Sequence, residues 1–408
     1  MLRKISLFIL CVVIFNSCSS QINASKVISS PEFIEGITRK GIAAFLELGI
    51  ERTQEYLPLL LGKRVGVVTN QTGEIRGKHL LDTLIGMKVN VVCVLAPEHG
   101  FRGNADAGAH VNDSIDAKTG VKILSIYGKK KKPSKEIMQT LDVVVFDMQD
   151  VGARFYTYIS TLHYVMQACA ENGKKLIVLD RPNPNGHYVD GPMNDTTSFI
   201  GMHPIPVVHG MTIGEYAQMI NGEGWLGNNL KCDLKVIAMQ NYNHQMKYNL
   251  PVHPSPNLAT MKAIYLYPSI CFFEGTVMSV GRGTDYAFEV YGNPNYSDTS
   301  FSFTPRSIKG KSMEPPLKGE KCYGKDLRVL NEDSIRAKGL DLTYLIDAYK
   351  STKVKDFFSL KTHFDLCAGS SLLRKQIMAG MTEAEIKATW QPGLKKFKEM
   401  RAKYLIYN

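Results

Sequence analysis

Residues 142–150, Asp-Val-Val-Val-Phe-Asp-Met-Gln-Asp, decide the fold class. The apolar run Asp142–Phe146 is short and rich in valine, and it gives way abruptly to polar residues. Such a run is typical of a strand that is buried on both faces of a parallel sheet. A helical pattern follows over Tyr156–Glu171 and stops at Asn172-Gly173, and Leu176–Leu179 is then a further strand. This order of strand, helix and strand predicts one unit of a parallel α/β sheet.

The same alternation occupies the sequence before residue 142. Strands are expected at Val65–Thr69, Val89–Leu95 and Val121–Ile126, with a helix at Gly77–Met87 and a short helix opened by Pro133. The sequence therefore predicts a mostly parallel sheet with helices on both of its faces.

Polar clusters follow four of the predicted strands at the point where each strand ends. They occupy residues 69–73 (Thr-Asn-Gln-Thr-Gly), 97–100 (Pro-Glu-His-Gly), 147–150 and 180–183 (Asp-Arg-Pro-Asn). Ligands of open α/β sheets bind outside the carboxyl ends of the strands, so these clusters predict a site along one edge. Because no GxGxxG or Walker sequence follows a strand, we expect no dinucleotide or nucleotide cofactor.

Length and composition exclude several classes of protein. The chain has 408 residues, of which 44% are hydrophobic and 21% charged, and these fractions exclude a mostly disordered or fibrous chain. The C-terminal part has helical patterns at Asp341–Lys350, Leu372–Ala379 and Thr382–Lys403. We expect one domain over residues 38–295 and a smaller domain over residues 296–408.

The net charge of +11 does not indicate nucleic-acid binding. The run Lys129–Lys132 precedes Pro133 and has no interleaved aromatic residues, which is typical of a solvated loop. Metal binding is not expected either, because the histidines lack HxH and HExxH spacing and the cysteines lack CxxC pairs.

The N-terminus has the pattern of an export signal. Arg3 and Lys4 precede the apolar run Ile5–Phe15, and small residues then lead to Cys18. The pattern is similar to a bacterial lipoprotein signal over residues 1–17, with lipidation at Cys18 and a tether over residues 18–37. The expected location is the cell envelope (periplasm or outer membrane), with the lipid as the membrane anchor. The alternative is plain secretion with Cys18 incidental.

Several long motifs occur in an order that resembles a known family. Together they make the chain similar to the NamZ-type exo-β-N-acetylmuramidases, from Gly62 to the C-terminus. The resemblance implies a Rossmann-like N-terminal domain, a smaller C-terminal α+β domain that closes a cleft, and no cofactor. It also implies release of N-acetylmuramic acid from the non-reducing ends of peptidoglycan fragments (muropeptides). Some relatives carry a Glu where this chain has Val280. The motifs occupy residues 97–103, 146–158, 179–184, 209–212, 254–257, 274–276 and 281–284.

Cleavage of a glycosidic bond needs a general acid and usually a second carboxylate. Glu98 is the best candidate for the acid, because it closely follows an apolar strand; the alternative is a structural Glu paired with an Arg. Asp147, Asp150 and Glu274 all qualify as the second carboxylate, although Asp150 could instead cap the helix that follows it. The acetamide of the substrate is a third possible nucleophile, so the stereochemical course stays open.

The lactyl carboxylate of N-acetylmuramic acid suits a planar guanidinium group, which can donate two parallel hydrogen bonds. At least one of four motif arginines is expected to bind it, the alternative for each being a structural ion pair. Tyr156 is expected to stack on a sugar or to lie in the core, and three polar residues complete the predicted binding set. The arginines are Arg102, Arg154, Arg181 and Arg282, and the polar residues are Asn70, His99 and His209.

A different class of function fits the same architecture. A non-catalytic lipoprotein that delivers muropeptides to a transporter would also have two α/β domains and a cleft. Such a protein needs no proton donor, so Glu98 in a strand-end motif favours the enzyme. A peptidoglycan amidase or esterase ranks last, because the sequence lacks a zinc cluster and a GxSxG elbow.

Overall fold

The computed structural model describes residues 45–98, 100–101, 113–128 and 130–407. Within it, Leu46–Asn408 form one unit. The predicted signal and tether, including Cys18, and the predicted site residues His99 and Arg102 lie outside the described residues.

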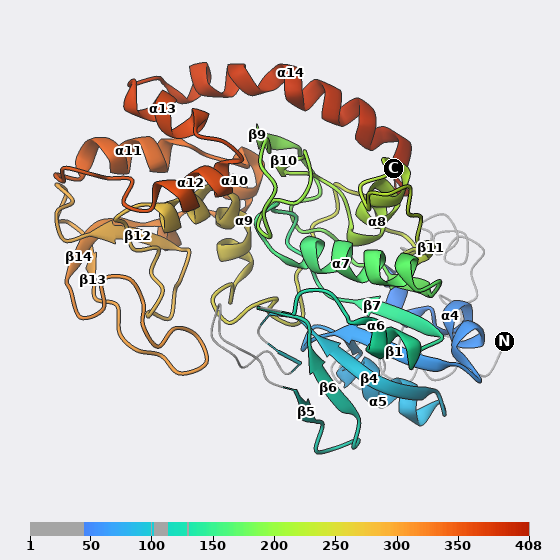
Figure 1. Ribbon diagram of the computed structural model, residues 1–408. Coiled ribbons are helices and arrows are strands. Elements are labelled where there is room, and N and C mark those ends of the chain that lie inside the picture. The colour runs from blue at the N-terminus through green and yellow to red at the C-terminus, as the bar shows by residue number, and fades with distance from the viewer. Residues whose placement is uncertain (1–44, 99, 102–112, 129, 408) are drawn as a thin grey trace, which may run out of the picture. The chain divides into compact units, whose positions relative to one another are not determined.

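A seven-stranded sheet forms the centre of this unit (Figure 1). Its strand order is β11-β8-β7-β1-β4-β6-β5, and all neighbours are parallel except the short edge strand β5. The prediction of a mostly parallel sheet is therefore confirmed. The strands are β1 (Arg64–Thr69), β4 (Asn90–Ala96), β5 (Ser114–Ile115), β6 (Lys122–Ser125), β7 (Val143–Asp147), β8 (Lys175–Leu179) and β11 (Asp233–Ile237).

Alternate residues of each central strand are buried on opposite faces of the sheet. Val144 and Phe146 of β7 pack with α7 and α8, whereas Val143 and Val145 pack with α4 and α5. Helices therefore cover both faces of the sheet, which confirms the prediction of helices on both faces. Burial on both faces also explains why the sequences of these strands are unbroken apolar runs. The helices of this part of the chain are α4 (Thr53–Leu60), which precedes β1, and then α5 (Leu80–Gly86), α6 (Lys135–Gln139), α7 (Tyr158–Glu171), α8 (Ile213–Gly222) and α9 (Met261–Ile270).

One predicted helix begins later than expected. Helix α5 starts at Leu80, because residues 74–79 form a small hairpin of β2 (Glu74–Ile75) and β3 (Lys78–His79). The two residues of its turn, Arg76 and Gly77, have φ angles of 48° and 80°. Positive φ at both positions is what a tight two-residue hairpin requires, and glycine adopts it without strain.

The C-terminal part is α+β, as predicted. It holds a three-stranded antiparallel sheet, β12-β14-β13, and five helices. The domain division predicted between residues 295 and 296 falls between β12 and β13, and it stays a prediction. These elements are β12 (Val290–Asn293), β13 (Ser302–Phe303), β14 (Cys322–Asp326), α10 (Glu332–Lys338), α11 (Thr343–Ser351), α12 (Lys361–Ala368), α13 (Leu372–Met378) and α14 (Glu383–Arg401).

The end of the chain returns to the central sheet. Helix α14 contacts β9 (Asp190–Met193), which pairs with β10 (Pro206–Val208). Beyond it, the Tyr407 hydroxyl donates a hydrogen bond of 2.6 Å to Asp180, the residue directly after β8. The two parts are thus held together at a strand end. In the part of the chain that the structure describes, no helix is both long and apolar enough to cross a membrane.

Candidate active site

A small cavity of about 180 Å³ lies at the carboxyl end of the sheet. Its wall includes Glu98, which follows β4, and Glu274, which belongs to the 3₁₀ turn η3 (Cys271–Gly275) after α9. Tyr156 and Arg282 line the same cavity. The structure therefore brings together four of the predicted site residues, two of them carboxylates, from segments almost 180 positions apart in the sequence.

Glu98 is held by hydroxyl groups. Tyr127 donates a hydrogen bond of 2.9 Å to Oε1, and Thr157 donates one of 2.8 Å to Oε2. Burial, followed by the charge of Glu98, raises the pKa of Tyr127, so this tyrosine stays a protonated donor. Thr157 is the N-cap residue of α7, but its side chain does not cap the helix. Its hydroxyl is directed to Glu98 instead.

Glu274 is held by a cation. The Nε of Arg282 donates to Oε1 at 2.5 Å, and the thiol of Cys271 lies 3.6 Å from Oε2. The Arg282 guanidinium also lies over the ring of Phe288, 5.0 Å from its centroid. In the contacts that the structure describes, Glu98 accepts hydrogen bonds from hydroxyls and Glu274 accepts one from a cation.

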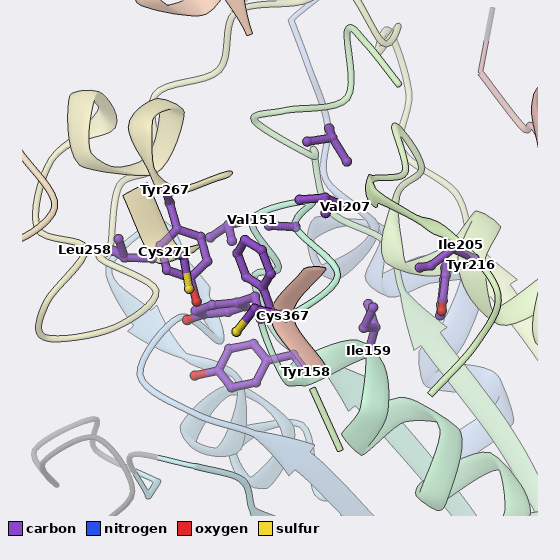
Figure 2. Close-up of a cluster of buried hydrophobic side chains, with 14 of the residues drawn as sticks. Val151, Tyr158, Ile159, Ile205, Val207, Tyr216, Leu258, Tyr267, Cys271 and Cys367 are labelled. Atoms are coloured by element: carbon purple, nitrogen blue, oxygen red, sulfur yellow. The ribbon is translucent and has the colours of Figure 1, made fainter. Parts of the chain in front are cut away.

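The rest of the cavity wall is aromatic and apolar. Tyr158, Leu258 and Tyr267 line it and are almost completely buried. Figure 2 shows Leu258 and Tyr267 beside Cys271 and above Tyr158 in one cluster of buried side chains. This wall suits the apolar faces of a sugar ring.

Two family models match this chain, one over residues 65–262 and one over residues 265–407. They are described as the N-terminal and C-terminal domains of the exo-beta-N-acetylmuramidase NamZ. The chain belongs to the NamZ family. Its resemblance to that family, inferred from the motifs, is thereby confirmed.

Named relatives agree with this assignment. The peptidoglycan beta-N-acetylmuramidase NamZ of Bacillus subtilis (strain 168) is 38% identical over 373 residues, which cover 86% of this chain and 89% of the relative. Two crystal structures of DUF1343 family proteins from Bacteroides fragilis NCTC 9343 are also similar. One is 48% identical with a TM-score of 0.83, covering 90% of this chain and 99% of that one. The other is 28% identical with a TM-score of 0.76, covering 89% and 99%.

Asp147 and Arg181 do not line the cavity of this NamZ family member. They form a bidentate ion pair with distances of 2.5 and 3.0 Å, and their side chains are 0% and 3% exposed. Asp147 ends β7 and Arg181 lies two residues beyond β8, so the pair joins two adjacent strand ends. This arrangement corresponds to the structural alternative considered for the arginine.

Arg154 is fully buried and likewise does not line the cavity. Its guanidinium donates to the carbonyl oxygens of Pro192, Ile205 and Cys367 at 2.7–2.8 Å. Burial lowers its pKa to about 10, so it stays charged at neutral pH. The Arg154 side chain thereby connects β9, the segment before β10 and α12 through hydrogen bonds to their carbonyl groups.

Asp150 and His209 lie together away from the cavity lining. Asp150 accepts a hydrogen bond of 2.7 Å from the backbone of Gly152, and its nearer oxygen is 3.9 Å from Nε2 of His209. Burial raises the pKa of Asp150 to about 7 and lowers that of His209 to about 3. Asp150 does not cap α7, whose N-cap is Thr157; it closes the tight turn that ends at Gly152.

Asn70 acts on the cavity through Tyr158. Its amide donates a hydrogen bond of 2.7 Å to the Tyr158 hydroxyl, while its carbonyl oxygen accepts from Thr72. Asn70 is therefore a positioning residue behind the wall. Tyr156, in the wall itself, donates to the carbonyl oxygen of Pro254 at 2.8 Å.

Sequence reasoning missed the two hydroxyls that hold Glu98. Tyr127 comes two residues after β6, so the rule that singled out the other strand ends also applies to it. Thr157 lies inside a motif that resembles the family, but it was interpreted only as part of a helix start. In the part of the chain that the structure describes, no cluster of three or more His, Cys, Asp and Glu residues could hold a metal ion.

Proposed function

We propose that this protein is an exo-acting glycoside hydrolase that releases N-acetylmuramic acid from the non-reducing ends of peptidoglycan fragments. The observation that carries the proposal is the presence of Glu98 and Glu274 in the wall of one small cavity. Membership of the NamZ family supports the identity of the sugar.

The different partners of the two carboxylates support a division of labour. Tyr127 and Thr157 contact the two oxygens of Glu98 through hydroxyl groups, which can both donate and accept a hydrogen bond. Arg282 holds one oxygen of Glu274 with a donor that is always charged. Glu98 is accordingly the general acid, which donates its proton to the leaving oxygen. Glu274 is the carboxylate that stabilises the positive charge that develops on the sugar ring.

Arg282 is the proposed partner of the lactyl carboxylate. It lines the cavity, whereas Arg154 and Arg181 do not. Its Nε donates to Glu274, and a guanidinium carries two further NH₂ groups in the same plane. A substrate without the lactyl group would leave these donors unpaired in a partly buried site, which lowers the rate by orders of magnitude.

Two chromogenic substrates test the function. We expect release of nitrophenol from 4-nitrophenyl β-N-acetylmuramide and almost none from the corresponding N-acetylglucosaminide. Equal rates on both would contradict recognition of the lactyl group. Tight binding of muropeptides without turnover would instead support the transport lipoprotein.

We also propose that the mature protein is anchored in the cell envelope by a lipid on Cys18. The charged start, the apolar run Ile5–Phe15 and the small residues before Cys18 support this. Mass spectrometry of the N-terminal peptide should find an acylated Cys18. An unmodified N-terminus at another residue would refute the anchor.

A further inference from the structure

A second, larger cavity adjoins the first. Its volume is about 1010 Å³, against about 180 Å³ for the small cavity. Glu274 and Arg282 line both of them, so this ion pair stands at the junction. The remaining walls of the larger cavity come chiefly from the segment 276–280, the loop 311–317 between β13 and β14, and residues near the start of α12.

The two cavities differ in their access to solvent. The wall of the small cavity includes deeply buried side chains such as Tyr158, Leu258 and Phe288, each about 1% exposed. The larger cavity includes Met313 and Leu360, which are 46% and 57% exposed. A polymer can therefore enter the larger cavity from solvent, whereas the smaller one, of about 180 Å³, has no room for such a chain.

We infer that the larger cavity binds the leaving fragment of the glycan, while the small cavity holds the single terminal sugar. This inference rests on the proposed function. An exo-acting hydrolase needs a closed pocket for one sugar and an open path for the rest of the chain. The carboxylates must lie where the two meet, because the bond that breaks joins the terminal sugar to the leaving fragment. Glu274 occupies that place.

The lining of the larger cavity fits the chemistry of the leaving fragment. That fragment is a chain of N-acetylated sugars in which every second sugar carries a lactyl carboxylate. Lys311 and His363 can supply positive charge, and Asn295 can supply an amide for hydroxyl and acetamido groups. Val277, Met278 and Val280 offer an apolar wall for the ring faces.

The opposite placement is inconsistent with the geometry. If the terminal sugar occupied the larger cavity, the rest of the glycan would have to occupy about 180 Å³ between buried aromatic side chains. Only a fragment of one sugar could then leave, and longer glycans would not be substrates.

Charge placed at the open end of the larger cavity tests the inference. Leu360→Asp and Lys311→Glu each add negative charge there, and neither residue contacts Glu98. On the tetrasaccharide of alternating N-acetylmuramic acid and N-acetylglucosamine, we expect kcat/KM to fall about tenfold in each variant. On 4-nitrophenyl β-N-acetylmuramide, whose leaving group is one small ring, kcat/KM should stay within about twofold of wild type.

Met378→Asp is the matched control. Met378 is 54% exposed, close to the value for Leu360, and it lines neither cavity. It should behave as wild type on both substrates. Equal losses on both substrates in Leu360→Asp, or no loss on the tetrasaccharide in either variant, would overturn the inference. Failure of the proposed function is distinguishable, because wild type would then hydrolyse neither substrate.

Discussion

Two carboxylate–arginine pairs with the same chemistry occupy different places in this molecule. Asp147–Arg181 lies between two strand ends and is almost completely buried, whereas Glu274–Arg282 lies at the junction of two cavities. In the second pair the side chains are 24% exposed for Glu274 and 18% for Arg282. The comparison teaches that a charged residue in a family motif can maintain the fold or face the substrate. The two cases differ in exposure: the pair that maintains the fold is almost completely buried, and the pair that faces the cavities is partly exposed.

The largest effect that we expect is on stability, from Asp147→Asn. The change leaves the buried Arg181 cation without its counter-charge, and breaking a buried pair in this way typically costs about 3–5 kcal/mol. Urea unfolding measures the loss, and kcat per folded molecule should stay near that of wild type.

Glu274→Gln is the matched change in the other pair. Its partner Arg282 is partly exposed, so solvent offsets more of the lost charge and the free energy of unfolding should change less. Turnover, in contrast, should fall about 100-fold or more, because the carboxylate faces the reacting sugar. If Asp147→Asn lost turnover to the same degree in folded protein, the two pairs would not differ in role.

The second prediction concerns Glu98, the carboxylate whose partners are hydroxyls. Glu98→Gln keeps the shape of the side chain but cannot donate a proton. General acid catalysis is typically worth about 10²–10⁴-fold, so kcat on a natural disaccharide should fall by about that factor with little change in KM. The nitrophenyl glycoside needs less protonation and should lose less. Unchanged kcat on the disaccharide would assign the acid to another residue, and Glu274 would be tested next.

The sequence predicted the sheet well because its strands are buried on both faces. Strands such as Val143–Asp147 need no alternation of apolar and polar residues, and the polar residues at their ends mark one edge of the sheet. The same rule correctly placed Glu98 beside a cavity, but it also selected Asp147 and Asp150, which the structure places outside the cavity lining. Position after a strand fixes the edge on which a residue lies. It does not determine whether the neighbouring loop covers the residue or leaves it accessible from the cavity.

Which residues face each other could not be predicted, because long-range packing decides it. Glu98 meets Tyr127 and Thr157 because β6 lies beside β4 and the start of α7 packs near both strand ends. Glu274 reaches the same cavity from a 3₁₀ turn almost 180 positions further along the chain. No local pattern encodes that approach.

The third prediction uses pH to separate Asp150 from the cavity carboxylates. Its pKa is raised to about 7 by burial, against about 3.9 in the unfolded chain. Below pH 4 both states are protonated and burial carries no penalty. As pH rises to about 7, the unfolded state loses its proton first, so Asp150 lowers the free energy of unfolding by about 2–4 kcal/mol.

Asp150→Asn removes this titration. The variant should therefore gain stability relative to wild type between pH 5 and pH 8, as measured by urea unfolding at each pH. His209 also titrates over part of this range, because burial lowers its pKa to about 3 and the proton is taken up by the unfolded chain alone, but this contribution is the same in both proteins and cancels in their difference. A stability difference that is constant over that range would show that Asp150 is ionised in the folded protein throughout.

The smallest effects come from one conservative change made in both pairs, Arg181→Lys and Arg282→Lys. Lysine keeps the charge but loses the planar fork, so it cannot reproduce the bidentate contact of Arg181 with Asp147. The buried pair should lose about 1–3 kcal/mol of stability, since a buried acceptor is left poorly satisfied. Turnover by folded Arg181→Lys should be unchanged.

Arg282→Lys should give the opposite result. Its pair is linked through Nε alone in the unliganded site, so stability should change by less than about 1 kcal/mol. A proposed second contact, from the guanidinium to the lactyl carboxylate, would weaken, and KM for the muramide should rise about tenfold with a smaller change in kcat. Activity on the N-acetylglucosaminide, which has no lactyl group, should not fall further. If the KM for the muramide were unchanged in Arg282→Lys, Arg282 would serve only to hold Glu274, and the two pairs would differ in location but not in kind.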